Sequence, residues 1–384
     1  MEARLILEDG SEFVGKSFGS ARDAIGEVVF HTGMTGYQEV LSDPACYGQL
    51  VTMAYPLIGN YGLTREDFES VRPHLFGLIV REYEPVPSNW RARYSLDEWL
   101  KRHDIPGISE IDTRMLVRKI REHGSMKGLL TVSKDPVDQL LAKLKQAEPV
   151  SGPVARVSTA HMYHAPGSGN RIVLIDLGVK NGILRELIRR EVDVVVVPYR
   201  TSAAEIHALA PDGILLAGGP GDPKELADTV DTVRELLEHY PFFGIGLGHL
   251  LFALACGADT VKMKYGHHGN SYPVKDLKSG RCLITPQNHM YTISEHSLEK
   301  SDLEVSYINN NDGTIEGLRH KHLPAFSVQF HPEASPGSTD ARFLFDEFLD
   351  MIERFRAEHP AEPRQAVFAR EAATRKGVLQ YAEK

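Results

Sequence analysis

The stretch that decides the fold is Phe243-Gly-Ile-Gly246-Leu-Gly-His-Leu250, in which an apolar strand runs into a residue flanked by glycines and a helix is expected to start at once. This order predicts a strand-to-helix elbow, a strained turn that exposes one residue at a helix N-terminus. Glycines on both sides suit such a turn because a Cβ would clash where the backbone bends so sharply. The helix dipole would stabilise a thiolate or an oxyanion there, but Gly246 itself offers no nucleophile.

Glycine-rich loops of this general kind can also bind phosphate. The GxGxxG dinucleotide fingerprint fails, because the third glycine, Gly248, comes one position early and His249 stands in its place. The sequence also contains no GxxxxGK[ST] phosphate loop. The elbow is therefore the better interpretation.

Strands and helices alternate on both sides of the elbow. The predicted strands span residues 172–175, 192–197, 213–217 and 242–245, and the predicted helices span 181–190, 229–239 and 250–255. The run at 192–197 is almost wholly β-branched, which is typical of a strand covered on both faces. This alternation predicts an α/β fold with right-handed crossovers and an open parallel sheet flanked by helices. Sites in such sheets form at the carboxyl ends of the strands.

A second chemical signal lies downstream, where His331 and Glu333 stand two residues apart in Ser327-Val-Gln-Phe-His-Pro-Glu333. A carboxylate that orients an imidazole is half of a nucleophile–base–orienter triad. Alone, this tripeptide is more often a surface turn. The elbow and the loop at residues 218–223 (GGPGDP) in the same domain favour a site.

The first half of the chain has a different rhythm. Short β-type runs at residues 4–7, 27–30, 49–53 and 75–80 alternate with glycine turns. A helix is predicted over 95–102, with a capping box formed by Ser95 and Glu98, and another over 112–123, stopped by Gly124. We therefore divide the chain into a first domain (1–147), a linker rich in Pro, Gly and Ser (148–170), a second domain (171–356) and a charged tail (357–384) to which we assign no function.

Composition limits the class of protein. The 384 residues suit two domains, and 42% hydrophobic with 25% charged residues is typical of a soluble globular protein. A net charge of −9 argues against a nucleic-acid partner. No apolar run approaches the roughly 20 residues of a membrane helix, and the first residues are acidic where a signal peptide would be basic. We expect a cytoplasmic protein that binds neither nucleic acid nor membrane.

The cysteines and histidines show no metal motif. Cys46, Cys256 and Cys282 lie far apart without a CxxC pair, which favours neither a disulfide framework nor a zinc site. We expect Cys256 to be a buried small hydrophobe. The 17 histidines are scattered, and the adjacent pair His267-His268 is interpreted as surface or packing residues of a loop. No metal site is expected.

Many ordered segments of the chain resemble one family, the small subunit of carbamoyl phosphate synthetase. In the first half these are residues 26–30, 32–39, 43–44, 55–60 and 111–114. In the second half the resemblance is to class I glutamine amidotransferases, through residues 219–223, the elbow, 261–269, 287–289 and 329–337. The resemblance implies a small-subunit-specific N-terminal α/β domain followed by a class I glutamine amidotransferase-like domain.

In that family the elbow residue is a cysteine whose thiolate attacks the glutamine amide, while a histidine moves the proton and a glutamate orients the histidine. By position, His331 and Glu333 are the retained catalytic pair and Gly246 is the nucleophile position. In the family, backbone N–H groups at the glutamine site hold the oxyanion. The positions that correspond to this site are Ala45, Gly219, Gly221, Leu247, Leu250, Asn288, Met290 and Tyr291.

The resemblance also implies a partner, a large subunit that uses ATP and Mg to convert bicarbonate and ammonia into carbamoyl phosphate for arginine or pyrimidine biosynthesis. This chain itself is expected to bind no cofactor. The complex is expected to be a ligase, whether a heterodimer or a higher oligomer of it.

The departures from the family pattern cluster at the glutamine. Gly246 lacks a nucleophile, Leu250 stands where a glutamine is usual, Ala45 where some members have serine, and Met290 where a small residue is usual. We expect an intact scaffold that has lost glutaminase activity and serves free ammonia. Two alternatives stay open: a working glutaminase with an unorthodox nucleophile, such as Cys46 or a water activated by His331, and a repurposed protein that binds a small amide or amino acid.

Overall fold

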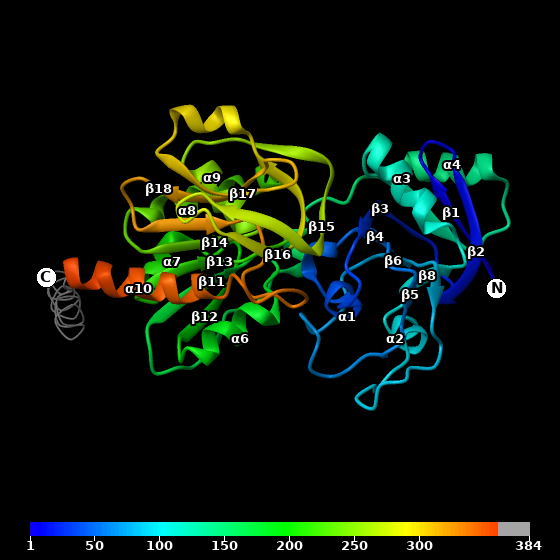
Figure 1. Ribbon diagram of the computed structural model, residues 1–384, viewed down its shortest axis with the longest axis horizontal. Helices are drawn as coiled ribbons and strands as arrows, with labels where there is room; N and C mark the ends of the chain where they lie inside the picture. The colour runs from blue at the N-terminus through cyan, green and yellow to red at the C-terminus, as the bar shows by residue number, and fades with distance from the viewer. Residues whose placement is uncertain (360–384) are drawn as a thin grey trace, which may run out of the picture.

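The protein is described here by a computed structural model that covers residues 1–359. It has two lobes: a β-barrel formed by the first third of the chain, and a large sheet layered between helices (Figure 1). The mixed α/β class expected from the sequence is confirmed. Within the described residues no helix combines the length and the apolar character that crossing a lipid bilayer requires.

The N-terminal lobe is a closed barrel in the order β1-β2-β8-β6-β4-β3-β9. Its strands are β1 (Glu2–Leu7), β2 (Glu12–Gly19), β3 (Ala24–His31), β4 (Gln49–Met53), β6 (Gly77–Ile79), β8 (Pro106–Ser109) and β9 (Met126–Thr131), with a small separate pair β5 (Leu57–Ile58) and β7 (Glu82–Tyr83). Closure leaves no free sheet edge in the barrel. Around it lie α1 (Tyr37–Leu41), η1 (Pro44–Cys46), α2 (Leu96–Arg102), α3 (Thr113–His123) and α4 (Val137–Gln146).

Local sequence signals located the N-terminal elements well. Three of the four predicted strands fall within β1, β3 and β4, and the fourth, predicted over 75–80, contains the shorter β6. The predicted capping box of α2 is present: the Ser95 hydroxyl accepts a bond from the Glu98 N–H, and the Glu98 carboxylate accepts one from the Ser95 N–H. Helix α3 starts after Asp112 and stops at Gly124, as expected. Closure into a barrel was not predicted, because it depends on pairings between strands far apart in the sequence.

The C-terminal lobe contains a ten-stranded sheet in the order β10-β12-β11-β13-β14-β19-β18-β17-β15-β16. Its strands are β10 (Tyr163–Ala165), β11 (Arg171–Asp176), β12 (Asp193–Pro198), β13 (Gly213–Leu216), β14 (Phe242–Ile245), β15 (Thr260–Asp276), β16 (Cys282–Ile293), β17 (Leu303–Asn309), β18 (Ile315–His320) and β19 (Ala325–Val328). The stretch from β12 to β19 is parallel, as predicted. Beyond β19 the sheet continues with β18, β17, β15 and β16, which pair antiparallel and which the sequence analysis did not predict.

The predicted linker contains regular structure. Residues 163–165 form β10, which pairs antiparallel with β12, and residues Val154–Val157 form the short helix α5. Strand β12 would otherwise present an unpaired backbone at the sheet edge, and β10 satisfies those groups. The segment 148–170, which we predicted to be a linker, therefore contains two short regular elements.

Helices cover both faces of the parallel sheet. On one face, α7 (Ala203–Ala208), α8 (Ala227–Leu237) and α9 (Leu247–Ala255) bury apolar side chains, and on the other α6 (Asn181–Arg189) and α10 (Phe343–Glu358) do so. The short 3₁₀-helices η2 (Pro223–Glu225) and η3 (Glu295–Lys300) also belong to this lobe. Helix α9 starts three residues before the predicted 250. Helix α10 reaches into the predicted tail, and the tail beyond residue 359 lies outside the described residues.

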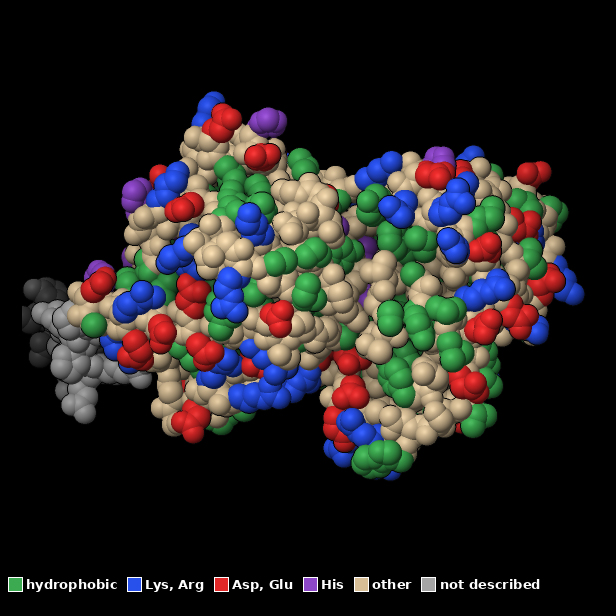
Figure 2. Space-filling model, viewed as in Figure 1, with side chains coloured by type: hydrophobic (Ala, Val, Ile, Leu, Met, Phe, Trp, Pro, Cys, Tyr) green, Lys and Arg blue, Asp and Glu red, His purple; other side chains and the backbone are tan. Residues whose placement is uncertain are grey.

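Polar contacts join the two lobes along a groove that is visible in Figure 2. The N–H of Asn181 donates to the carbonyl of Glu69 at 2.8 Å, and the N–H of Thr32 donates to the carbonyl of His268 at 3.0 Å. The Asn288 amide donates to Asp43 at 2.8 Å. Backbone and buried side chains both take part, so the lobes hold a defined relative position.

Phe243 at the centre of β14 provides a test of this core. Its ring stacks on Phe326 at 4.5 Å and meets Phe348 at 5.7 Å. Phe243→Ala is expected to lower the free energy of unfolding by about 3–5 kcal/mol, through lost burial and the cavity it leaves. Urea denaturation followed by circular dichroism measures this. Phe343→Ala is the control: its side chain is 43% exposed, and we expect a small effect. Equal losses from both variants would contradict this account of the core.

Candidate active site

The predicted elbow is present at Gly246, between β14 and α9. Its backbone has φ 58° and ψ −114°, a conformation that strains any residue with a side chain. Its N–H donates to the carbonyl of Val328 at 2.9 Å, which fixes the turn to β19. The flanking positions must be glycine because there is no room for a Cβ. A Cβ at Gly244 would lie 2.7 Å from the Gly248 carbonyl oxygen, and a Cβ at Gly248 would lie 2.4 Å from the Leu216 carbonyl oxygen.

The predicted His–Glu pair is also formed. Nδ1 of His331 lies 2.9 Å from Oε1 of Glu333, and both side chains are buried. With the Nδ1 proton directed to the carboxylate, Nε2 is the ring nitrogen left for proton transfer. His331 lines the same cavity as Gly246, so the histidine and the elbow meet as the sequence predicted.

A residue that the sequence analysis missed holds this pair. Nζ of Lys180, at the start of α6, lies 3.1 Å from Oε1 of Glu333, and the lysine side chain is 4% exposed. Burial alone would raise the pKa of Glu333, but the nearby Lys180 and His331 outweigh it and lower that pKa to about 2. Burial would likewise lower the pKa of Lys180, yet Glu333, Glu69 and Asp43 hold it above its usual value. Glu333 is thus fixed as a carboxylate.

The predicted glutamine-site residues converge on one small cavity of about 40 Å³. Its lining includes all eight predicted positions and the two predicted catalytic positions that face it: Ala45, Gly219, Gly221, Gly246, Leu247, Leu250, Asn288, Met290, Tyr291 and His331. Glu333 is not part of the lining; it contacts His331. The sequence analysis missed five further lining residues: Gln49, Gly218, Pro220, His289 and Gln329.

Two of these missed residues leave polar groups in the buried wall. Oε1 of Gln49 and both polar atoms of the Gln329 amide are buried without a hydrogen-bond partner among the described residues. Buried polar groups normally have partners, so these amides are suited to a small polar ligand. A cavity of this size has room for a molecule the size of water or ammonia. The apolar side chains of Leu250 and Met290 occupy part of the cavity wall and offer no hydrogen bond to such a molecule.

Asn288 links the cavity to the N-terminal lobe. Its Nδ2 donates to Asp43 Oδ2 at 2.8 Å, and its Oδ1 lies 2.7 Å from Nδ1 of His268. The other oxygen of Asp43 accepts a bond from the N–H of Ala45 at 2.9 Å. The N-terminal lobe therefore supplies one wall of the cavity through a short, buried chain of hydrogen bonds.

The cysteines are poorly placed to act as nucleophiles. Burial raises the pKa of the Cys46 thiol far above its usual value, and Asp43 adds to this. Burial also raises the pKa of Cys256, to about 12, and this residue lies at the opposite end of α9 from Gly246. Cys282 is exposed on β16. A thiolate is the reactive form of cysteine, so a raised pKa disfavours attack.

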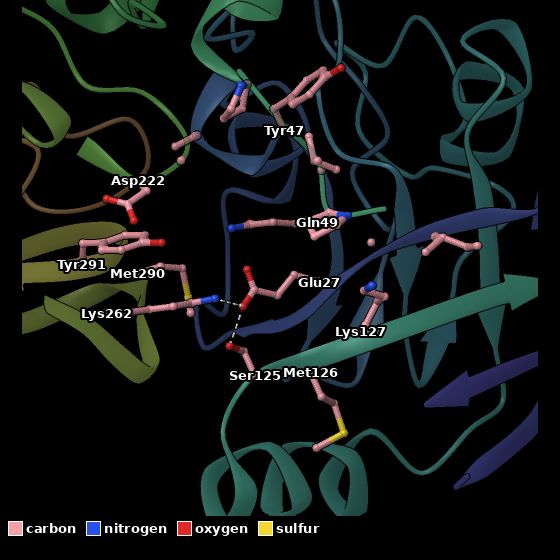
Figure 3. A pocket seen from close by; sticks show the side chains of 18 of the residues that line it. Glu27, Tyr47, Gln49, Ser125, Met126, Lys127, Asp222, Lys262, Met290 and Tyr291 are labelled. Atoms are coloured by element: carbon pink, nitrogen blue, oxygen red, sulfur yellow. Dashed lines mark hydrogen bonds and ion pairs between the residues drawn. The ribbon is translucent and has the colours of Figure 1, made fainter. Parts of the chain in front are cut away.

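A larger cleft between the lobes leads to the cavity. It has a volume of about 420 Å³ and shares Ala45, Gln49, Gly221, Met290 and Tyr291 with the smaller cavity. Figure 3 shows Met290 and Tyr291 facing it from one side and Glu27 from the other; Glu27 accepts bonds from Lys262 and Ser125. A solute reaching the cavity from this cleft passes between residues of both lobes.

The expected loop position of His267 and His268 is wrong. Both lie within β15 and are buried, with 5% and 2% of their surface exposed. Strand β15 is rich in polar residues, which hid its strand character.

These features define the class of protein. Residues 173–351 match the family model for class I glutamine amidotransferases, which covers the elbow and the His331–Glu333 pair. Residues 5–130 match the model described as the CPSase domain of the carbamoyl-phosphate synthase small chain.

Curated relatives extend over nearly the whole chain. The carbamoyl phosphate synthase small chain of Bacillus caldolyticus is 57% identical over 356 residues, 92% of this chain and 98% of that protein. The pyrimidine-specific small chain of Bacillus subtilis (strain 168) is 54% identical over 361 residues, 94% of this chain and 99% of that protein. The chain belongs to the carbamoyl phosphate synthase small chain family.

Removing Lys180 tests the electrostatic arrangement. Lys180→Met is expected to lower the free energy of unfolding by about 3–5 kcal/mol, because Glu333 would remain buried without its counter-charge. Lys224→Met is the matched control: Lys224 pairs with Asp259 at 2.7 Å but is 50% exposed, so a loss below about 1 kcal/mol is expected. Denaturant titration of both variants measures the difference, and a loss below 1 kcal/mol for Lys180→Met would show that the pair is not needed.

Proposed function

We propose that this chain is the small subunit of a carbamoyl phosphate synthase whose own glutaminase activity is lost, so that the complex makes carbamoyl phosphate from ammonia. The observation that carries the proposal is the elbow: Gly246 keeps the strained geometry of a nucleophile position but has no side chain. His331 and Glu333 remain aligned beside it with nothing to deprotonate but water.

The surroundings of the elbow support this proposal. Leu250 and Met290 place two apolar side chains in the wall of the small cavity, which disfavours the binding of a polar glutamine side chain there. The unpartnered amides of Gln49 and Gln329 suit a small polar solute such as ammonia, which could pass through the scaffold. Cys46 is disfavoured as a thiolate because burial and Asp43 raise its pKa, and the contact from Asn288 Nδ2 to its sulfur at 3.4 Å offsets this only in part.

The partner in this proposal is a large subunit that binds ATP and Mg and carries out the phosphorylation steps, while this chain binds no cofactor. Family membership supports that partner. The relatives named as pyrimidine-specific make pyrimidine synthesis a reasonable pathway to test, alongside arginine synthesis.

A second candidate function is residual hydrolysis of glutamine by a water that His331 activates. The intact His331–Glu333–Lys180 arrangement favours it. The backbone N–H of Leu247, at the first turn of α9, has no partner within the helix and is available to an oxyanion. Loss of a triad nucleophile typically costs about six orders of magnitude in rate, so this activity would be very slow.

The first experiment is carbamoyl phosphate formation by this chain co-purified with its large subunit, supplied in parallel with glutamine or ammonium. We expect synthesis from ammonium and none from glutamine. Robust synthesis from glutamine would overturn the proposal, and Cys46→Ala in that complex would then identify or exclude Cys46 as the nucleophile. Failure to bind a large subunit would overturn the scaffold role.

Restoring the nucleophile gives a complementary test. A Cβ at Gly246 would lie 3.3 Å from the Gly218 Cα, so a cysteine fits with a shift of a few tenths of an ångström. Gly246→Cys combined with Leu250→Gln is expected to hydrolyse glutamine several orders of magnitude faster than the natural chain. The helix N-terminus should also make the new thiol react with iodoacetamide at neutral pH.

Gly246→Ala combined with Leu250→Gln is the matched control, because it adds the same Cβ and the same backbone strain without the thiol. It is expected to stay inactive. If the cysteine variant folds, reacts with iodoacetamide and still releases no glutamate, then residues other than the nucleophile also account for the loss of glutaminase activity.

A further inference from the structure

A second group of chemically able side chains lies behind the cavity wall, where β15, β16 and β18 meet. One ring nitrogen of His267, one ring nitrogen of His289 and a carboxylate oxygen of Glu316 all lie within 4.8 Å of one another. Glu316 is fully buried and the two histidines are largely so. Among residues 1–359 this is the only group of at least three His, Cys, Asp or Glu side chains with ligand atoms this close together.

The hydrogen bonds of the two imidazoles direct one nitrogen of each ring toward Gln287. Nδ1 of His289 lies 2.9 Å from the carbonyl oxygen of Tyr291, so it carries that ring's proton and Nε2 carries a lone pair. That Nε2 lies 3.3 Å from Oε1 of Gln287, which also lies 2.7 Å from Nδ1 of His267. Nε2 of His267 is occupied by Asp312 at 2.8 Å. The acceptors around Nδ1 of His267 are therefore Gln287 Oε1, the Glu316 carboxylate and, beyond Gln287, Nε2 of His289, and a metal ion would take the place of the proton on Nδ1.

Glu316 gives an independent indication. Its Oε2 is buried and has no hydrogen-bond partner among the described residues, although an unpaired buried carboxylate oxygen is costly. Oε1 is at the limits of contact, 3.5 Å from His267 Nδ1 and 3.4 Å from Asn309 Nδ2. Rotating the Gln287 amide would give the imidazoles a donor, but Oε2 of Glu316 would still lack a partner.

We propose that His267, His289 and Glu316 bind a divalent transition-metal ion, with Gln287 Oε1 or a water in the fourth position. Two imidazoles and one carboxylate in a buried pocket suit Zn²⁺, which binds such ligands at about 2.0–2.2 Å in a four-coordinate arrangement. Modest side-chain rotations would bring the three ligand atoms to that distance from a shared ion. The Tyr291 carbonyl and Asp312 already hold the outer nitrogens of both rings, as partners of ligating histidines commonly do.

Such an ion would affect the small cavity by fixing the position of β16. His289 belongs both to this group and to the lining of the small cavity, and β16 carries Asn288, Met290 and Tyr291 into the same cavity. A metal that joins β16 to β15 and β18 would fix the strand from which these side chains project. The proposed role is therefore structural, and it does not depend on whether the chain hydrolyses glutamine.

The test is Zn²⁺ binding to the full-length chain after treatment with a chelator, measured by calorimetry and by elemental analysis after gel filtration. We expect one Zn²⁺ per chain and a rise in melting temperature on adding it. Glu316→Gln and His289→Gln are each expected to weaken binding at least tenfold. Circular dichroism of the metal-free variants would show that they are folded.

The exposed histidines of the same lobe provide the matched control. His320 and His322 have ring centroids 6.1 Å apart and offer an adventitious surface site. The double variant His320→Gln, His322→Gln is expected to bind Zn²⁺ as the natural chain does. Absence of stoichiometric binding by the natural chain, or unchanged binding by Glu316→Gln, would overturn the proposal.

Cobalt gives a measurement that needs no variant. Co²⁺ in a four-coordinate site of nitrogen and oxygen ligands absorbs visible light far more strongly than six-coordinate Co²⁺ on a surface. We expect the strong spectrum from the natural chain with one equivalent of Co²⁺, and its loss when Zn²⁺ is added. A weak spectrum would count against the site even if both variants failed to fold.

Discussion

Lys180 and Glu333 form an ion pair with almost no access to solvent, at the point where three parts of the molecule meet. Lys180 begins α6 and Glu333 follows β19, while Glu69 of the N-terminal lobe accepts a bond from the N–H of Gly182 at 2.9 Å and pairs with Arg185. Burying charges is costly, and the cost is offset only when each charge keeps its partner. The relative position of the lobes and the orientation of His331 therefore depend on one set of charges.

This arrangement explains why the N-terminal lobe belongs to the site. Asp43 and Glu69 both act on Lys180, and Asp43 also holds Ala45 and Asn288 in the wall of the cavity. A glutamine amidotransferase domain without this lobe would lack one wall of the cavity and two of the carboxylates around the lysine. The barrel is thus part of the chemical environment of the site.

Sequence reasoning recovered what depends on local order. The elbow, the capping box at Ser95 and the parallel strands each leave a signal within a few residues, and the structure contains all of them. The barrel, the antiparallel extension of the sheet and the role of Lys180 could not be predicted, because they arise from pairings between distant segments. Strand β15 was missed for a further reason. Its polar residues, including two histidines, are typical of a loop, and it forms a strand because it pairs with β16. The group formed by His267, His289 and Glu316 comes from three strands and has no spacing motif.

The glycine at the elbow has a physical consequence beyond the missing thiol. A residue with a side chain at φ 58° and ψ −114° is strained by about 1–3 kcal/mol. Such strain serves a reaction only where the strained side chain takes part in it. Glycine adopts the same backbone at lower cost, so the elbow can persist without its nucleophile. Glycine avoids the strain at the elbow, and Leu250 and Met290 place apolar side chains in a cavity wall that is otherwise partly polar, while the buried charges that hold the lobes together are complete. The charges that fix the shape of the molecule, with the His331–Glu333 pair beside them, are therefore present without a nucleophile at the elbow.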